Sequence, residues 1–190
     1  MRPFVITAAA LCAALGCTTA RPVLPGANPT LPEGEGFLVL DLVTDVQIAR
    51  LECSGVIAAH DIPPGEHLVL LAIDAGAYRW NRVSFSGPDG ELRLELGRDG
   101  PWKFRVEPGR ISYPGNLVFR GAELLWTAHR LEARSLNRSS MAFHRLEKLY
   151  PELLGRYPIL YTGHHRDDFL ERYAAALGAA RRTAARPPAP

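Results

Sequence analysis

The densest group of side chains able to bind a metal ion lies near the end of the chain, where four of the five residues from His164 to Asp168 are histidine or aspartate. Zinc accepts imidazole nitrogen and carboxylate oxygen, so a loop could turn His164, His165 and Asp168 toward one ion. The chain holds no HExxH-type spacing, however. The alternative is a solvated turn whose aspartates favour the positive end of a following helix. We favour the turn, and the sequence predicts no metal or other cofactor.

A second group of polar side chains flanks the turn signal Pro63-Pro64-Gly65. A hairpin there would bring His60 and His67 close together, and Asp61 could complete a weak metal site. We favour the alternative, in which the three side chains lie on the surface of the turn.

Side chains that could act as nucleophiles lack the context that activates them. Ser84 and Ser86 have no Gly-x-Ser-x-Gly motif around them, and no phosphate-binding glycine loop is present. Cys53 has no local motif of a cysteine–histidine pair, and we expect it to be buried as a small hydrophobic residue. The sequence therefore predicts no enzymatic activity, with a metal-dependent hydrolase as the most remote alternative.

Tryptophan side chains could bind sugar rings if they were exposed on a flat sheet. Trp102 alternates in phase with Phe104 and Val106, which predicts that it is part of the core. Trp80 and Trp126 are the remaining candidates, so a glycan-binding face stays open as an alternative.

The elements that would position these residues are short strands separated by turn signals over residues 36–135. Residues 92–96 and 102–106 alternate between apolar and charged side chains, which is typical of half-buried strands. The run from Phe37 to Thr44 is apolar on both faces and predicts a central strand. Near Arg82 the alternation slips, which predicts a bulge. Further strands are expected at 46–52, 56–59, 68–73, 111–113, 117–120 and 123–133. This spacing predicts a mainly β fold, an antiparallel β-sandwich of transthyretin-like or immunoglobulin-like type with seven to nine strands.

Helical periodicity replaces the strands over residues 136–183. Ser139 or Ser140 can cap a first helix, and Pro151 should break or kink it. Residues 157–161 are expected to be extended, and a second helix should open at Asp167 or Asp168. We therefore predict a C-terminal helical appendage beside the sandwich, followed by a disordered tail over 184–190.

The N-terminal residues carry the features of an export signal. Arg2 precedes a short apolar stretch that ends in Leu15-Gly16-Cys17. This resembles the lipobox of bacterial lipoproteins, which implies that residues 1–16 are a signal peptide and that Cys17 becomes the lipidated N-terminus. Two or three acyl chains of the palmitate type would hold the protein on a membrane. An ordinary signal cleaved after Ala20, with Cys17 discarded, is the alternative.

The residues after the cysteine bear on position and location. Thr18, rather than Asp, follows Cys17, and by the same resemblance this implies the outer membrane, facing the periplasm. Residues 17–35 contain the lipidated cysteine and are rich in proline, so we expect a tether that lifts the sandwich off the membrane.

Turn motifs within the strands give a second resemblance. Residues 62–70, followed by Gly76-Ala77-Tyr78, look like the hairpins of transthyretin-like and carboxypeptidase-regulatory-like sandwiches. Residues 104–117 and the helical stretch 150–153 resemble uncharacterised bacterial envelope lipoproteins with that sandwich. The resemblance covers residues 36–155 and implies an envelope location without catalytic residues.

Charge is divided unevenly along a chain of net charge +2. Residues 33–99 hold five basic and twelve acidic side chains, whereas residues 100–190 hold fifteen basic and eight acidic ones. Either the two halves interleave, or basic residues form one face toward an anionic envelope surface, such as anionic lipid or lipopolysaccharide, or toward an envelope protein, including a second copy of this protein. The residues of such a face would be Arg120, Arg130, Arg134, Arg138, Arg145 and Lys148. The near-neutral balance and the export signal argue against nucleic acid as a partner.

These observations predict a membrane-anchored bacterial envelope lipoprotein with a structural or interaction role. A ligand-binding module for glycan or metal on the same sandwich is the alternative.

Overall fold

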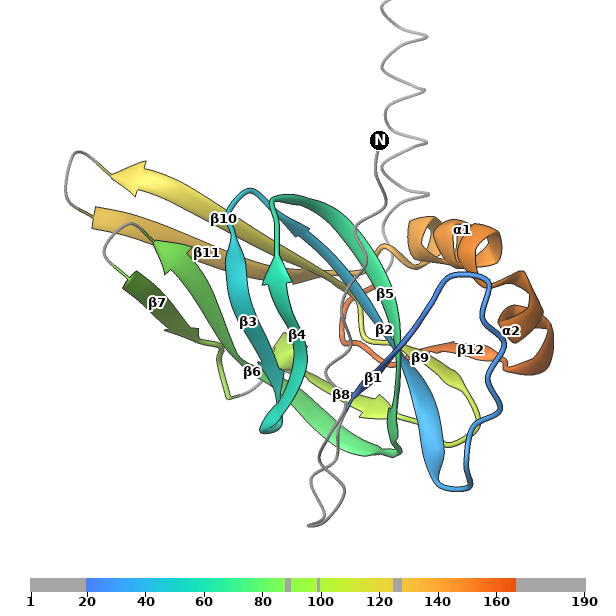
Figure 1. The fold of residues 1–190 in the computed structure, drawn as a ribbon. Helices are drawn as coiled ribbons and strands as arrows, with labels where there is room; N and C mark the ends of the chain where they lie inside the picture. The colour runs from blue at the N-terminus through green and yellow to red at the C-terminus, as the bar shows by residue number, and fades with distance from the viewer. Residues whose placement is uncertain (1–19, 88–89, 99, 125–127, 167–190) are drawn as a thin grey trace, which may run out of the picture.

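Two β-sheets packed face to face form the body of the protein (Figure 1). The computed structural model describes residues 20–87, 90–98, 100–124 and 128–166. The expected β-sandwich with a short C-terminal helical region is confirmed. The described residues form twelve strands, more than the seven to nine expected, because one sheet gains strands at its margins.

The first sheet has seven strands and mixed directions. Its path runs β1–β5–β2–β10–β11, and β9 pairs with both β2 and β12. The pairings of β2 with β9 and β10, and of β9 with β12, are parallel, whereas the others are antiparallel. The strands are β1 (Arg21–Val23), β2 (Glu35–Thr44), β5 (Gly65–Asp74), β9 (Ile111–Tyr113), β10 (Asn116–Leu124), β11 (Ala128–Leu136) and β12 (Ile159–Tyr161).

The second sheet has five strands, all antiparallel to their neighbours. Its path runs β4–β3–β6–β7, with β8 pairing with the other half of β6. A short 3₁₀ helix, η1 (Gly100–Trp102), leads into β8. The strands are β3 (Ile48–Cys53), β4 (Val56–Ile62), β6 (Gly76–Gly87), β7 (Gly90–Glu95) and β8 (Lys103–Val106).

Apolar side chains from both sheets fill the space between them. Phe85 of β6 meets Phe119 of β10 edge to face, with ring centroids 5.9 Å apart. The register between β3 and β6 shifts where Cys53 pairs with Trp80 and Glu52 pairs with Arg82. One residue of β6 is thereby left over, which confirms the bulge predicted near Arg82.

A second apolar core lies on the outer face of the first sheet. Helices α1 (Ser139–Leu149) and α2 (Pro151–Arg156) cover this face, as Figure 1 shows. Proline at the first position of α2 separates the two helices at Tyr150, as predicted, because proline cannot donate the backbone hydrogen bond that a continuous helix needs. The buried residues of this core include Phe37, Val39, Leu70, Leu146 and Leu153.

The expectation of a free tether is wrong for the residues that the structure describes from Ala20 onward. β1 forms an edge strand against β5, and Val23 is buried in the second core. The backbone N–H of Gly26 donates to the carbonyl of Leu149 at 2.9 Å. Prolines exclude a helix here but are tolerated in an edge strand and in extended chain, so the segment can cover an apolar sheet face. We call residues 20–32 the N-terminal cover.

One expected strand boundary is also wrong. A strand was expected at 123–133, but β10 continues to Leu124 and β11 begins at Ala128. Nine paired positions between Asn116 and Leu136 therefore make one long hairpin of two equal strands, instead of a short strand at 117–120 followed by a longer one at 123–133. Residues 1–16, which we expect to be a signal peptide, lie outside the described residues together with Cys17. The same holds for the second helix expected from Asp167 or Asp168 and for the tail expected at 184–190.

Candidate functional site

A buried carboxylate lies on the outer face of the first sheet, beneath α1. Asp41 of β2 has the same strand parity as Phe37 and Val39, whose side chains belong to the second core. It is only 3% exposed. A carboxylate in such a position needs partners, because an uncompensated buried charge is costly.

Three side chains from three elements supply those partners. The hydroxyl of Tyr113 on β9 donates to Oδ2 of Asp41 at 3.1 Å. Nη1 of Arg145 on α1 donates to Oδ1 at 3.2 Å. The side chain of Asn116 on β10 also hydrogen-bonds to the carboxylate. We call Asp41, Tyr113, Asn116 and Arg145 the Asp41 cluster.

Burial and charge act in opposite directions on Asp41. Burial raises its pKa above the ordinary value, and the nearby Arg145 and the hydrogen bonds from Tyr113 and Asn116 only partly offset this. The pKa of Tyr113 is raised as well, by burial and by the adjacent carboxylate. The backbone N–H of Arg138, just before α1, donates to the same hydroxyl. Tyr113 therefore stays protonated and acts as a fixed donor.

The contacts of the Asp41 cluster support a structural role, in which they attach α1 to the first sheet, and not a catalytic one. Among the described residues, no nucleophile and no second carboxylate contacts Asp41. Arg145 is about one third exposed, so the cluster reaches solvent through its guanidinium group. Oδ1 of Asn116 has no hydrogen-bond partner within the described part of the chain, which leaves one acceptor unused.

The candidate metal ligands His164 and His165 do not belong to a group of described side chains that could bind a metal ion. His164 is exposed, and the backbone of His165 is fixed by Tyr161 and Asn137. Nε2 of His165 is buried without a partner among the described residues. No group of three or more His, Cys, Asp or Glu side chains in residues 20–166, apart from the short undescribed gaps, could hold a metal ion. Asp168 lies outside the described residues.

The turn at Pro63 separates the other two histidines. His60 contacts the carboxylate of Asp61 at 2.8 Å, and both side chains are exposed. Nε2 of His67 instead meets the carbonyl oxygen of Pro63 at 2.8 Å. The structure therefore agrees with surface positions on a turn.

Trp80 does not offer a sugar-binding surface. It is 1% exposed and packs between the sheets, with its ring centroid 5.0 Å from that of Phe104. Simple alternation from Val83 and Phe85 would place Trp80 on the outer face of the sheet. The bulge shifts this alternation by one residue, so Trp80 lies on the inner face. Trp102 is only partly buried against the core, and Trp126 lies outside the described residues.

Cys53 and Ser84, two of the possible nucleophiles, are buried side chains. Cys53 is buried between the sheets, as expected, and burial raises the pKa of its thiol to about 12. It is therefore almost wholly protonated at neutral pH and a poor nucleophile. Ser84 is buried and hydrogen-bonds to the side chain of Glu91.

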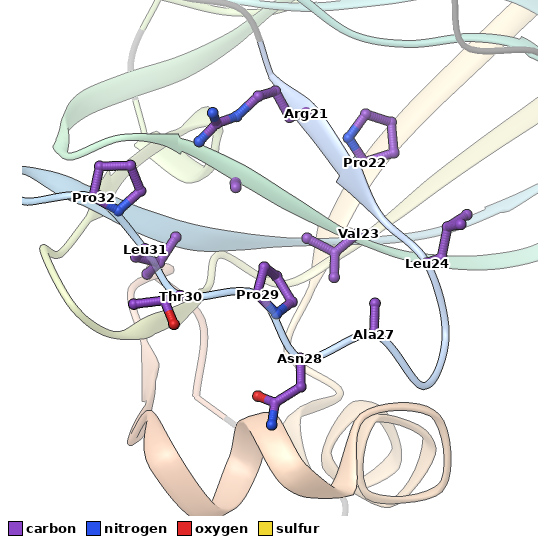
Figure 2. Close-up of a pocket in the computed structure, with 11 residues that line it drawn as sticks. Arg21, Pro22, Val23, Leu24, Ala27, Asn28, Pro29, Thr30, Leu31 and Pro32 are labelled. Atoms are coloured by element: carbon purple, nitrogen blue, oxygen red, sulfur yellow. The ribbon is translucent and has the colours of Figure 1, made fainter.

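A hollow with a volume of about 630 Å³ opens beside β1 (Figure 2). Its wall is the N-terminal cover together with Ala72 of β5. The polar side chains around it are already engaged, since Arg21 pairs with Glu35 and Asn28 bonds to Glu152 and Arg156. Figure 2 shows the amide of Asn28 directed toward the helices instead of into the hollow. The hollow therefore has no polar group set aside for a ligand.

The acidic and basic halves of the chain interleave. Arg120 pairs with Asp45 at 3.3 Å and Arg145 pairs with Asp41, so cations of the second half neutralise acids of the first. Arg134 pairs with Glu132 at 2.9 Å. Three members of the expected basic face thus have acidic partners, and the side chain of Arg130 lies outside the described set.

Comparison with known proteins gives no relative. No family model, no curated protein and no solved structure matches this chain. The resemblance to transthyretin-like envelope lipoproteins therefore stays a prediction. Within the part of the chain that the structure describes, no helix has the length and apolar character needed to cross a membrane.

The Asp41 cluster was not predicted from the sequence. Its signal was a single acidic residue inside a strand that is otherwise apolar on both faces, residues 37–43. Such a residue must find a cation or several donors. Its partners come from β9, β10 and α1, up to 104 residues away, so only the fold identifies them.

Proposed function

We propose that this protein is a lipid-anchored bacterial envelope protein with a non-catalytic interaction role. The observation that carries the proposal is the position of Cys17. The described sandwich begins at Ala20, three residues after this cysteine. A modified Cys17 would therefore lie directly beside a folded body.

Cleavage before Cys17 would remove none of the described residues, so every described contact of the two cores would stay in place. Cleavage after Ala20, the alternative, would remove a residue that packs against the core between the sheets. It would also leave Arg21, the partner of Glu35, as the charged chain end. The geometry therefore favours the lipobox interpretation of the signal.

The non-catalytic part of the proposal is supported by how the polar groups are used. The Asp41 cluster, the ion pairs of the second sheet and the polar rim of the hollow all bond within the chain. The partner class that we propose is another envelope protein. The glycan-binding alternative has lost Trp80 and now depends on Trp126.

The experiment compares Cys17→Ser with Cys53→Ser in bacteria fed an alkyne-bearing fatty acid. We expect the wild type and Cys53→Ser to incorporate the label and sediment with membranes, and Cys17→Ser to lose both properties. The control is informative because the buried Cys53 leaves the acylation site untouched. Membrane association of an unlabelled Cys17→Ser protein would contradict the proposal.

The partner is sought by crosslinking in the native host, followed by purification and mass spectrometry. A reproducible envelope protein, absent from a Cys17→Ser sample, is the expected outcome. Recovery of a known envelope complex without any partner for this protein would contradict the interaction role.

A further inference from the structure

We propose that the anchored protein stands on the membrane through one end of its sandwich, with no spacer between lipid and folded body. The inference rests on the proposed lipidation of Cys17 and adds which surface meets the lipid. The surface is the end at which β1 begins, and the occupant is the phospholipid headgroup layer.

The first step is the reach of the chain. Three peptide units connect Cys17 to Ala20, so they span at most about 11 Å even when fully extended. Ala20 packs against the core between the sheets, and Arg21 is paired in register with Ala72. Because these residues are fixed to the body, the usable leash ends at Ala20 and not at residue 35.

The second step is the composition of this end. The backbone N–H of Ala75, in the turn between β5 and β6, donates to the carbonyl of Gly34 at 2.8 Å. The N–H of Gly109, in the turn between β8 and β9, donates to the carbonyl of Glu35 at 2.9 Å. These turns and the start of β1 therefore form one surface, which we call the β1 end.

The third step is the charge of the β1 end. Arg21 pairs with Glu35, and Arg105 pairs with Glu107 at 3.0 Å. Exposed Glu33, Asp74 and Arg110 add two negative charges and one positive charge. A surface of mixed sign gains little from anionic lipid, so the short leash alone should hold it there, and the contact should be insensitive to salt.

The fourth step is the opposite end of the molecule. β10 runs parallel to β2, with Phe119 beside Thr44, and continues past the end of β2 to Leu124. From the level of Arg21, which pairs through Ala72 with Phe37, the strands extend about 40 Å at 3.3 Å per residue. Figure 1 shows the β10–β11 hairpin projecting at the end remote from the start of β1. This hairpin should therefore point away from the membrane, toward the partner.

The test measures how close each end lies to lipid headgroups. The lipidated protein, which begins at Cys17, carries a single fluorophore at Pro108→Cys, on the β1 end, or at Arg120→Cys, on β10. It is reconstituted into phosphatidylcholine–phosphatidylglycerol vesicles with a headgroup nitroxide quencher. Cys53 needs no replacement, because its buried thiol should not react, and a sample without an added cysteine checks this.

We expect Pro108→Cys to be quenched several-fold more strongly than Arg120→Cys, with no change between low and high salt. Inserting ten glycine and serine residues before Ala20 should abolish the quenching of Pro108→Cys. Equal quenching at both positions would overturn the proposal, because the sandwich would then lie on its side. Absence of quenching at both positions would overturn it as well.

Failure of the proposed function has a different signature. If Cys17 is not acylated, the protein does not enter the vesicle fraction at all and its mass shows no acyl chains. A protein that is acylated and vesicle-bound, but unquenched at Pro108→Cys, refutes only the orientation.

Discussion

The outer faces of the two sheets are opposites. The outer face of the first sheet is apolar, and the helices and the N-terminal cover bury it. The outer face of the second sheet carries ion pairs, in which Arg82 contacts both Glu52 and Glu95. No described helix packs on this second face (Figure 1). The first sheet is thus the middle layer of the fold, whereas the second sheet has one face exposed to solvent.

The difference explains why residues 20–32 and the helices α1 and α2 pack on the first sheet. A strand with apolar residues on both faces needs a layer on each side. The second sheet supplies the inner layer for β2, and the helices together with residues 20–32 supply the outer one. The N-terminal segment is therefore part of the fold because β2 and β5 would otherwise expose an apolar face to water.

The largest loss of stability should follow removal of apolar bulk from the covered face. Leu146→Ala on α1 deletes a fully buried side chain and should lower the free energy of unfolding by about 2–5 kcal/mol. Urea unfolding of residues 18–190 measures this. Met141→Ala, on the exposed side of the same helix, is the control and should change it by less than about 0.5 kcal/mol. Equal losses would mean that α1 is not a covering layer.

Removing a charge from the outer face of the first sheet should lower the free energy of unfolding more than removing one from the outer face of the second sheet. Asp41→Ala leaves the Arg145 guanidinium and the Tyr113 hydroxyl without their acceptor, at a cost of about 3 kcal/mol. Arg82→Ala should leave the urea midpoint almost unchanged, because water can take the place of the lost guanidinium beside the exposed Glu95. A larger shift for Arg82→Ala would reverse the proposed contrast between the two faces.

The N-terminal cover should contribute a smaller but measurable amount. Val23→Ala removes two buried methyl groups from β1 and should cost about 1–2 kcal/mol. Leu24→Ala, whose side chain is 69% exposed, should have almost no effect on thermal or urea unfolding. If both variants behave like the wild type, residues 20–32 do not stabilise the fold.

The smallest effect should be the pH dependence that Asp41 introduces on the covered face. Because the pKa of Asp41 is raised on folding, its contribution to stability is fully present below its unfolded pKa of about 3.9. That contribution is lost as the pH rises through the folded pKa. The stability of wild type relative to Asp41→Asn should therefore fall from pH 3 toward neutrality. A rise would show that Arg145 and the donors outweigh burial.

Local pattern predicted the sandwich well and the outer layer poorly. Alternation in residues 102–106 and the slip near Arg82 each depend on neighbouring residues, and the structure confirms a half-buried β8 and the bulge. The same expectation is wrong for most of residues 92–96, because Leu92 is 42% exposed and no residue of β7 is buried. The helix break at Pro151 is equally local. The apolar side chains on both faces of residues 37–43 also predicted a strand covered on both sides. No local pattern, however, indicates which segments cover its outer face.

The missed features all depend on long-range pairing. The proline-rich residues 20–32 read as a tether because proline excludes regular helix, although an edge strand tolerates it. The Asp41 cluster joins β2 to elements that follow it by 70 residues or more. Trp80 remained an open sugar-binding candidate because the bulge changes its parity relative to Val83 and Phe85 in the same strand.

The bond between Tyr150 and Val23 has a consequence for the order of assembly. The hydroxyl of Tyr150 donates to the carbonyl of Val23 at 3.0 Å across a separation of 127 residues. Synthesis begins at the N-terminus, so β1 and β2 exist long before the helices that close over them. Until Tyr150 is made, the apolar face of β2 and β5 remains open to chaperones, proteases and other chains. A nascent chain halted before α1 should therefore be degraded or aggregate, and late closure makes this a slow-folding topology.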